Sequence, residues 1–582
     1  MLRRFKVNSA DKQDMDRMLA RRTGAIATFV LAMVMAFSSV SCTFVQAQEL
    51  ANPVLETEGD AARRSASRGT CKSADVIVYG ATPSGIAAAI QAARLKKTVI
   101  LLEPTQHIGG MMAGGLSRTD AAPHRGVYGG IVTEFFDKAT TTYQLTDPIR
   151  IYFEAKWAEQ TFGTMLNASK VTVIRGQLIS SVKLKNRAIQ SLTTTSGRSF
   201  CGTSFIDASY EGDLMQRSGA KTIVGRESQA QYGEEDAGVV KLRLPPVGSR
   251  TNPTELVLDP YIVPGDPQSG LLPGLSPIGQ QPIGSADKSV MAFNYRLCVT
   301  NTPGNKRPFT KPADYDPMRY EAHARFIAAL NAQGQPISEN YFVGADLTVK
   351  NKLDVNSNAY FSTDVWNIGY DYAVGNEAKR QEIRKSVRSF IQGLMWFAVS
   401  DPRVPQATRD YTAQYGYCAD EYTDNDNFPY QLYVRQARRL VGQYVLTEND
   451  LKNKPNFLDS IGVGYAPLDQ HGMIRTVQDG HIAEDNRYPF SVAPYQIPYR
   501  ALLPNRSDVT NLLVSVAVSA SHVAYTSIRM EPTYMVMGQA AGAAAALAPD
   551  GDVSKVSIAK LRSTLLKAGQ VLKWDKSIRL KS

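Results

Sequence analysis

Glycines and one acid are regularly spaced between residues 80 and 103. The apolar run Val76–Tyr79 ends in Gly80-Ala81-Thr82-Pro83-Ser84-Gly85, an alanine-rich stretch follows from Ile86 to Leu95, and a second apolar run covers Val99–Leu102. This order of strand, turn, helix and strand predicts a Rossmann unit, whose helix N-terminus binds a pyrophosphate through backbone N–H groups. Glu103 follows the second strand, where a carboxylate accepts hydrogen bonds from an adenosine ribose.

The turn departs from the usual dinucleotide fingerprint at one position. Gly80 permits the tight bend, and Gly85 lets the helix pack closely on the sheet. Thr82 replaces the middle glycine, and its β-carbon crowds the pyrophosphate, although its hydroxyl could donate to a phosphate oxygen. We expect the cofactor-binding residues of this turn to be Gly80, Thr82, Pro83, Ser84 and Gly85, with an ordinary strand–helix turn as the alternative.

Two further segments support a cofactor site. Gly109-Gly110 follow Glu103 and open a glycine-rich run that reaches Leu116, so they allow a second close approach of the backbone to the same cofactor. The run Phe205–Asp207 reads as a strand ending in an acid, and Asp213 supplies a second acid after Gly212.

Here the sequence resembles the FAD-dependent oxidoreductases with the glutathione-reductase-like fold, above all an exported bacterial group with the Asp-Ala-Ser-Tyr-Glu-Gly-Asp-Leu signature. The resemblance covers most of residues 74–548, and it is carried by the signature at 207–214 and by the segments 224–228, 295–298, 433–439, 521–524 and 527–532. It implies FAD as the cofactor, with Asp207 and Asp213 at the cofactor and Asp213 near the ribityl chain.

The C-terminal part of the sequence agrees with this resemblance. The strand Leu512–Val516 is followed by a loop that holds His522 and Arg529, and then by an alanine- and glycine-rich helix from Tyr534 to Leu547. The small residues of that helix, Gly538 among them, allow close packing against the cofactor domain, and its N-terminal partial charge suits the pyrimidine end of a reduced flavin. A generic packing helix is the alternative.

The reaction class is narrowed by motifs that the sequence lacks. It has neither a second complete dinucleotide fingerprint nor a CxxC pair, both of which a pyridine-nucleotide disulfide reductase needs. We expect hydride transfer to flavin from a C–H bearing OH or NH, in a small or carbohydrate-like substrate, with oxygen or another acceptor taking the electrons. A flavin-dependent reductase of activated double bonds, with an arginine as proton donor, and a noncatalytic envelope protein are the alternatives.

The predicted catalytic residues are His522, Arg296 and Arg529. Oxidation of an alcohol or amine requires a base for the heteroatom proton, and His522 is the predicted base because its loop precedes the cofactor-facing helix. Met291–Thr300 alternates, so Arg296 lies on a polar face that could cross the isoalloxazine ring, with an edge-strand ion pair as the alternative. Arg296 and Arg529 could bind a carboxylate or a developing oxyanion. No metal site is predicted.

The predicted fold class is α/β: a discontinuous Rossmann-like FAD-binding domain with an α+β substrate domain. The FAD domain is expected at 71–235 and again at 496–568, the substrate or cap domain at 236–495, and a tail at 569–582. Helical periodicity predicts helices at 376–400 and 429–444 and a packing helix around 558–565. The acidic and aromatic segment 411–433 could bind a hydroxylated substrate or form a solvated loop.

The N-terminus predicts export. Arg21-Arg22, the apolar stretch Gly24–Val40 and Val45-Gln46-Ala47 have the order of a signal peptide over residues 1–47, followed by a flexible leader at 48–70; a retained anchor is the alternative. The signal carries +4 of the net charge of +11, and the other basic residues are scattered among acids, which disfavours nucleic acid as a partner. Cys71, Cys201, Cys298 and Cys418 form no metal pattern. An oxidising compartment would permit disulfides, which sequence alone cannot pair, and we expect packed or incidental cysteines.

Overall fold

The computed structural model describes residues 71–119, 126–146, 151–249, 252–344, 346–356, 361–485 and 490–575, all within the unit Gly69–Ser582. The predicted signal peptide and leader, residues 1–70, lie outside the described residues, as do residues 576–582 of the predicted tail. None of the described helices is long and apolar enough to span a membrane.

The core of the cofactor region is a seven-stranded sheet. Its strands run in the order β3 (Thr172–Ile174), β2 (Val99–Leu102), β1 (Lys72–Tyr79), β6 (Ser199–Asp207), β5 (Ala188–Thr194) and β4 (Ile179–Lys185), and β20 (Leu512–Val514) also pairs with β6. The pairs from β3 to β6 and the β6–β20 pair are parallel, whereas β4, β5 and β6 pair antiparallel. This topology confirms the predicted α/β class.

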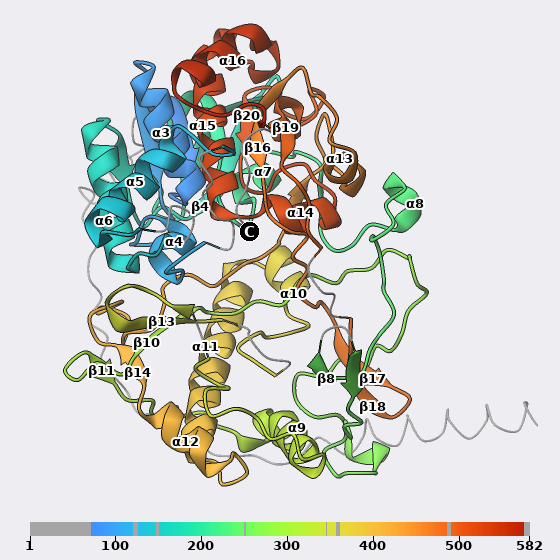
Figure 1. Ribbon diagram of the computed structural model, residues 1–582. Coiled ribbons are helices and arrows are strands. Elements are labelled where there is room, and N and C mark those ends of the chain that lie inside the picture. The colour runs from blue at the N-terminus through green and yellow to red at the C-terminus, as the bar shows by residue number, and fades with distance from the viewer. Residues whose placement is uncertain are drawn as a thin grey trace, which may run out of the picture. The chain divides into compact units, whose positions relative to one another are not determined.

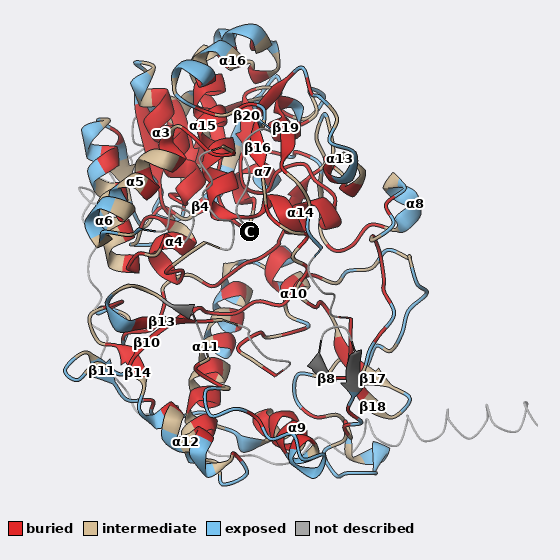
Figure 2. Ribbon diagram, viewed as in Figure 1, coloured by how far each residue is buried: buried red, intermediate tan, exposed pale blue. Residues whose placement is uncertain are grey.

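Two buried helices cover this sheet. In α3 (Pro83–Arg94) and α15 (Glu531–Leu547) nearly every residue is buried, as Figure 2 shows. They approach each other through glycines of α15: a β-carbon on Gly538 would lie 2.0 Å from the carbonyl oxygen of Ser84, and one on Gly542 would lie 2.1 Å from that of Ala88. Small residues are therefore required because the two backbones are in contact.

A second region contains a five-stranded sheet and three larger helices. The strand order is β11 (Lys306–Arg307), β14 (Gly416–Cys418), β10 (Leu297–Thr300), β13 (Lys352–Val355) and β12 (Asp346–Leu347). In Figure 1, α9 (Glu321–Ala332), α11 (Glu377–Ser400) and α12 (Gln406–Ala413) lie on this side of the unit, away from α3 and α15. The predicted domain boundaries at 235/236 and 495/496 stay predictions.

The remaining helices and strands lie outside these two sheets and the helices named so far. The helices are α4 (Gly110–Gly114), α5 (Ile131–Tyr143), α6 (Ala155–Ala168), α7 (Asp213–Arg217), α8 (Gln229–Tyr232), α10 (Gly369–Val374), α13 (Glu448–Asn453), α14 (His522–Ile528) and α16 (Ile558–Lys567). The paired strands are β7 (Thr222–Ile223) with β15 (Arg439–Leu440), β8 (Pro246–Ser249) with β9 (Asn252–Glu255), β16 (Ser460–Gly464) with β19 (Tyr495–Pro498), and β17 (Arg475–Gln478) with β18 (His481–Glu484).

One predicted helix and much of one predicted strand are wrong. Residues 429–444 contain no helix, because their arginines are drawn into separate ion pairs: Arg435 binds Asp364, and Arg439 binds Glu227. Regular strand within 291–300 is limited to Leu297–Thr300. The helices predicted near 376–400 and 558–565 are confirmed as α11 and α16.

The expectation of incidental cysteines is also wrong. Cys71 forms a disulfide with Cys201, and Cys298 forms one with Cys418, with Cα–Cα distances of 5.8 and 5.6 Å. The first joins the start of β1 to its neighbour β6, and the second joins β10 to its neighbour β14. Strand pairing brings each pair of cysteines together, and that pairing was not readable from the cysteine spacing alone.

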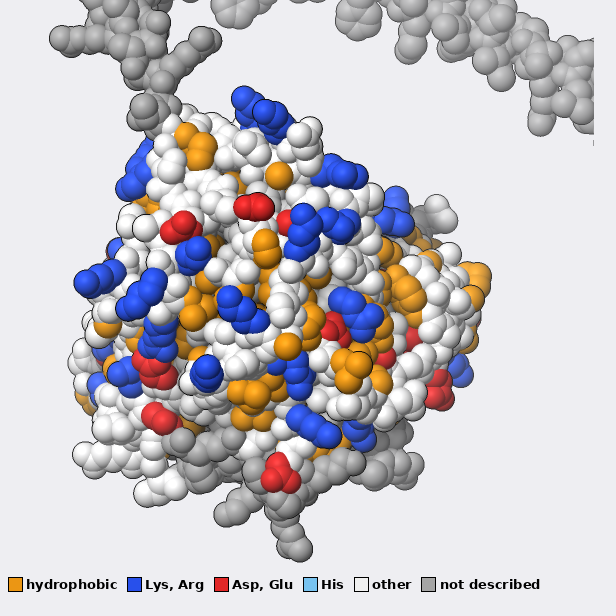
Figure 3. Space-filling view, turned by 90° about the horizontal axis from the view of Figure 1, so that it is seen from above, with side chains coloured by type: hydrophobic (Ala, Val, Ile, Leu, Met, Phe, Trp, Pro, Cys, Tyr) orange, Lys and Arg blue, Asp and Glu red, His pale blue; other side chains and the backbone are white. Residues whose placement is uncertain are grey.

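Basic residues on one face of the molecule are dispersed. Figure 3 shows Lys and Arg side chains lying singly or in small groups among apolar and acidic ones, without one continuous stripe. A stripe on one face is the arrangement that nucleic-acid binding favours. The expectation that nucleic acid is not a partner stays a prediction.

Candidate functional site

A cleft lies at the carboxyl ends of β1, β2 and β6, where open α/β sheets bind their ligands. We call it the cofactor cleft; its volume is about 560 Å³. Of the predicted cofactor-binding residues, Gly80, Thr82, Glu103, Gly110 and Asp213 line it. Its opposite wall comes from α11 and from the loop that ends at Leu432.

Glu103 is held rigidly in the wall of the cofactor cleft. Its Oε2 accepts the backbone N–H of Ala81 at 2.8 Å, and its Oε1 accepts the N–H and the hydroxyl of Thr105 at 2.8 and 2.7 Å. Burial raises the pKa of this carboxyl, and the three hydrogen bonds act against that rise. The group is thus oriented before any ligand binds, as expected of a ribose-binding acid.

The side chains of the turn before α3 form hydrogen bonds with other groups of the protein. Thr82 caps the helix by accepting the N–H of Gly85 at 3.3 Å, and its hydroxyl donates to the carbonyl of Ala208 at 2.8 Å. The Thr82 hydroxyl therefore donates its proton to Ala208 and not to a phosphate oxygen. Ser84 is fully buried and bonds to Ser515, and Gly85 packs beneath Gly80, where a β-carbon would lie 1.9 Å from the Gly80 carbonyl oxygen.

The predicted cofactor roles of Ser84, Pro83 and Gly538 stay predictions. All three are buried, and none of them lines the cofactor cleft. Pro83 begins α3, and Gly538 packs on Ser84, so these residues shape the turn rather than touch the cleft. The backbone of the turn is presented at the cleft by Gly80 instead.

The double glycine forms a left-handed turn before α4. Gly109 has φ +99° and Gly110 has φ +49°, conformations that favour glycine. A β-carbon on Gly110 would lie 2.5 Å from the hydroxyl oxygen of Tyr210, a second residue that lines the cleft. Gly109 is the N-cap of α4 and does not line the cleft, so its contribution is the turn itself.

The two acids of the signature have different surroundings. Asp207 is fully buried and accepts hydrogen bonds from Ser209 and from the backbone N–H of Met215, so it closes the turn after β6 and does not line the cleft. Burial raises its pKa to about 6. Its carboxylate is bonded inside the protein, and its predicted cofactor role stays a prediction.

Asp213 lines the cofactor cleft and carries a bidentate ion pair. Its two oxygens lie 2.7 and 3.0 Å from NH1 and NH2 of Arg380 on α11. The predicted place of Asp213 near the ribityl chain stays a prediction. The structure shows in addition that Arg380 neutralises the Asp213 carboxylate.

Two cations of α11 were missed by the sequence analysis. Arg380 and Arg384 are four residues apart, so they lie on one face of the helix, and both line the cofactor cleft. Arg384 donates to the hydroxyl of Tyr372 at 2.9 Å and pairs with Glu377. The four-residue spacing of Arg380, Arg384 and Arg388 on a predicted helix was the available signal.

A stacked pair bridges the cofactor cleft at His107. The rings of His107 and Tyr430 stack with centroids 3.5 Å apart and an 8° interplanar angle. The imidazole also lies 3.2 Å from both Glu159 and Asp424. The hydrogen bond with Glu159, opposed by burial and aided by the charges of both acids, raises the pKa of His107.

The loop 411–433 is thus tied to the rest of the chain by its acids. Asp424 lies against His107, and Asp426 pairs with Arg388 of α11. The side chains of Asp424 and Asp426 are still 61% and 71% exposed, and Asp424 lines the cofactor cleft, so substrate binding and a solvated loop both stay predictions for this segment.

A second polar cluster, the His471 cluster, lies beyond the cleft residue Leu432. Nδ1 of His471 lies 2.9 Å from Asp364, and Nε2 lies 3.5 Å from Asp469. Each acid also binds an arginine: Arg435 reaches Asp364 at 2.8 Å, and Arg529 reaches Asp469 at 2.8 Å. His471 and Asp469 remain partly exposed, with 18% and 22% of their side chains accessible.

The His471 cluster is connected to the cofactor cleft through Tyr433. Arg529 donates to the Tyr433 hydroxyl at 3.2 Å, and Tyr433 directly follows Leu432 in the chain. Arg529, a predicted catalytic residue, is therefore part of this cluster. His471 was missed because its partners lie about 100 residues away or across a turn.

His522 does not occupy an accessible position. It is fully buried at the first residue of α14; Nδ1 lies 2.9 Å from Glu227, and its backbone N–H bonds to the same carboxylate. Arg439 binds the other oxygen of Glu227 at 2.7 Å. Burial lowers the pKa of His522, the imidazole does not line the cofactor cleft, and Nε2 is buried without a hydrogen-bond partner. The predicted role of His522 as the base stays a prediction.

Arg296 also lies inside the protein and bonds to an internal acid. It is fully buried, and Nε donates to Asp354 at 2.7 Å. Asp354 further accepts the N–H of Ser117 from the loop after α4. The ion pair with Asp354 agrees with the alternative that the sequence left open for Arg296, and Cys298 is in a disulfide. The predicted catalytic role of Arg296 stays a prediction.

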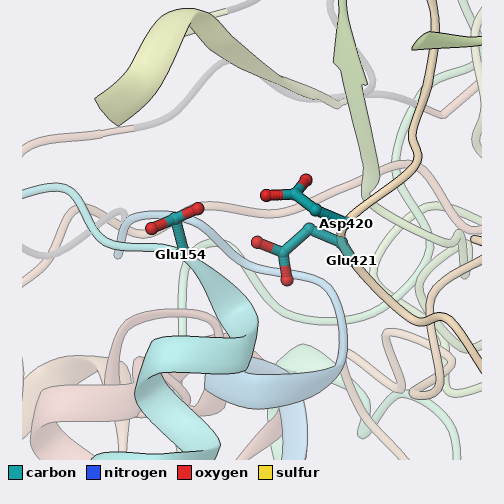
Figure 4. Close-up of side chains that lie close together, drawn as sticks. All are labelled: Glu154, Asp420 and Glu421. Carbon is teal, nitrogen blue, oxygen red and sulfur yellow. The ribbon is translucent and has the colours of Figure 1, made fainter. Parts of the chain in front are cut away.

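Three carboxylates gather around one buried lysine. Figure 4 shows Glu154, Asp420 and Glu421 converging, an arrangement that could hold a metal ion. The ammonium of Lys352 lies 2.6, 2.9 and 2.8 Å from these three acids. Lys156 and Lys350 also pair with these acids, so amino groups of the chain balance the charge of the cluster. The expectation that the chain holds no metal stays a prediction.

Comparison with known proteins places the chain in a family. A family model for FAD dependent oxidoreductases matches residues 75–565, and no curated protein matches the chain. Among solved structures, the chain is similar to the THI4 protein of Thermovibrio ammonificans (22% identity, 31% of this chain and 76% of that chain, TM-score 0.23). It is also similar to the OxyS anhydrotetracycline hydroxylase from Streptomyces rimosus (11%, 29% and 40%, TM-score 0.22) and a flavoprotein/dehydrogenase from Cytophaga hutchinsonii (17%, 26% and 42%, TM-score 0.20).

The chain spans 40% and 42% of the last two structures. The family model, by contrast, includes every residue that lines the cofactor cleft. The chain belongs to the FAD dependent oxidoreductase family.

Proposed function

We propose that this enzyme oxidises a C–H bond bearing OH or NH in a small or carbohydrate-like substrate, with oxygen or another external acceptor taking the electrons. The observation that carries the proposal is the His471 cluster, a partly exposed imidazole set between two carboxylates and joined to the cofactor cleft through Tyr433. Such an oxidation needs a group that takes the heteroatom proton.

The residues of the cofactor cleft fit FAD. Gly80 and Gly110 line the cleft at positive φ, where a β-carbon would collide with neighbouring protein atoms, and Glu103 is oriented for a ribose. Arg380 and Arg384 also line the cleft; each pairs with an acid of the cleft wall, and guanidinium groups can also bind phosphates. When bound, FAD supplies the acceptor for a hydride.

The proton transfer is carried out by side chains of this protein. His471 receives the proton of the substrate OH or NH, and the carboxylates of Asp364 and Asp469 stabilise the imidazolium that results. Arg435 and Arg529 hold those carboxylates in place. Burial would raise the pKa of Asp469, but the charges of His471 in its protonated form and of Arg529 outweigh it and hold this pKa well below its usual range. Asp469 therefore remains a carboxylate at neutral pH.

An anaerobic substrate screen tests this proposal. The purified FAD-loaded protein is mixed without oxygen with panels of alcohols, sugars and amines, and the visible absorption of the oxidised flavin is followed. Bleaching by a member of these panels is the expected result. If none bleaches the flavin while the chemically reduced protein is reoxidised by enoates, the enzyme is a reductase of activated double bonds.

We further propose that the enzyme is exported, to the periplasm or the exterior. The signal-like order of residues 1–47 supports this, as do the two disulfides, which persist in oxidising compartments. Fractionation of the producing bacterium, N-terminal sequencing and thiol titration of the denatured protein test it. We expect a mature chain beginning at Gln48 without free thiols; a cytoplasmic protein with four free thiols would contradict export.

A further inference from the structure

Glu531 is a buried acid with an unused oxygen. It is the first residue of α15, a helix of 17 residues, and only 3% of it is exposed. Its Oε1 accepts a hydrogen bond from the Tyr210 hydroxyl at 2.9 Å, whereas Oε2 is buried without a hydrogen-bond partner. A buried polar atom without a partner costs roughly 1–3 kcal/mol, so a ligand group that satisfies Oε2 is expected.

Glu531 lies one hydrogen bond from the cofactor cleft. Tyr210 lines the cleft next to Gly110, and its hydroxyl accepts the N–H of Met111 while it donates to Glu531. The partial positive charge of the α15 N-terminus lies at the same place. The ligand available to this wall is the FAD that the family binds.

We propose that Glu531 stands in the flavin site as a neutral carboxylic acid, donating a hydrogen bond from Oε2 to an acceptor atom of the flavin ring. Burial raises the pKa of Glu531 to about 8, with Tyr210 and the charge of Arg529 acting in the opposite direction. The acid is thus protonated at neutral pH, and Oε2 can carry the proton.

The neighbours of Glu531 do not titrate near that pH. Burial raises the pKa of Tyr210 and Tyr534 well above the usual value and that of Tyr525 to about 12. Arg529 keeps its charge in an ion pair with Asp469. A proton exchanged at this end of the helix between pH 7 and 9 is therefore assigned to Glu531.

The inference depends on bound FAD and not on the proposed substrate, so it is tested without substrate. The reduction potential of the bound flavin is measured from about pH 6 to about pH 10. Reduction adds negative charge beside Glu531, so above its pKa the carboxylate should take up one extra proton. Above that pKa the reduction potential should fall more steeply with rising pH, with an additional slope of about 30 mV per pH unit for a two-electron couple.

Three variants decide the outcome. Glu531→Gln keeps a neutral hydrogen-bond donor and should lose the steep segment. Glu234→Gln changes another buried acid, whose pKa burial raises to about 7 but which bonds to Ser521 and touches no cleft residue, and it should behave as the wild type. Tyr210→Phe removes the hydrogen bond that favours the carboxylate, and it should move the steep segment to higher pH.

A steep segment that persists in Glu531→Gln, or that is absent from the wild type, would overturn the inference. If Glu531→Gln does not fold or bind FAD, Tyr210→Phe decides: an unmoved steep segment would equally contradict it. Failure of the substrate screen leaves these potentials measurable, so the two proposals fail separately.

Discussion

Glu227 holds His522 by two hydrogen bonds to one carboxylate oxygen, from the imidazole Nδ1 at 2.9 Å and from the backbone N–H at 3.0 Å. The burial of Glu227 would raise its pKa, but Arg439 and His522 outweigh it and keep the pKa well below its usual value. This histidine is therefore fixed by a buried carboxylate, and we expect it to hold the chain in place rather than to exchange protons with a substrate.

The same substitution at two histidines separates structure from catalysis. An asparagine amide can replace Nδ1 of histidine as a donor to a carboxylate. His522→Asn should lower the unfolding free energy by about 1–3 kcal/mol and leave flavin reduction by substrate within about threefold, because the imidazole does not line the cleft. His471→Asn should slow flavin reduction by roughly 10²–10⁴-fold. Stopped-flow reduction of FAD-loaded protein measures both, and equal losses would remove His471 from the mechanism.

Arg384 should contribute to FAD affinity. It lines the cofactor cleft, whereas Arg388, one turn further along α11, does not. Arg388 binds Asp426, which lies outside the cleft, and Asn425, which is one of the lining residues. Arg384→Met should weaken FAD binding by about tenfold or more, since charge-assisted hydrogen bonds contribute about 1.5–3 kcal/mol. Arg388→Met is the matched control and should not. Equilibrium dialysis against FAD checks this, and equal effects of the two substitutions would contradict the assignment.

Two glycine-to-alanine substitutions on helices should have opposite effects. Gly538→Ala places a β-carbon 2.0 Å from the Ser84 carbonyl, so α15 and α3 must separate, and we expect a loss of about 3 kcal/mol. Gly163→Ala on α6 meets no atom within 4 Å and should stabilise by about 0.5–1 kcal/mol, because alanine favours the helix. Urea denaturation gives both values. A neutral Gly538→Ala would mean that the two helices are not in backbone contact.

Stability should depend on pH through His323. This imidazole is 3% exposed, both ring nitrogens lack hydrogen-bond partners, and burial, helped by Arg475, lowers its pKa to about 3. Between pH 6.5 and 3 the unfolded state binds the proton and the folded state does not, so stability falls with acidification by up to about 1.4 kcal/mol per pH unit.

His323→Leu should remove this part of the pH dependence. It should also raise the unfolding free energy at neutral pH, because two unsatisfied polar atoms are replaced by an apolar side chain. Denaturant midpoints at several pH values make the comparison. If the unfolding free energy of the variant falls with acidification as steeply as that of the wild type, groups other than His323 control this pH dependence.

The elements that were predictable from sequence are those set by local patterns. The strand Val99–Leu102, the turn at Gly80 and the helices at 377–400 and 531–547 follow from periodicity, small residues and glycine spacing. Each depends on residues within one turn or one strand of each other, and the family resemblance rests on the same segments.

The polar partnerships were not predictable in this way. Asp213 and Arg380 are 167 residues apart, and the disulfides join cysteines 130 and 120 residues apart. Such pairings arise only when the sheets are assembled, and a sequence shows the charges but not their partners. The helix predicted at 429–444 failed for the same reason, since its arginines bind acids from other elements.

The reductive half-reaction tests the central claim most directly. A substrate that bleaches the flavin in the anaerobic screen is compared with the same compound carrying deuterium on the carbon that bears OH or NH. The account predicts complete bleaching at a rate lowered by deuterium, and a further large loss of rate in His471→Asn. Bleaching that is insensitive to deuterium, or no bleaching by any alcohol, sugar or amine, would contradict it.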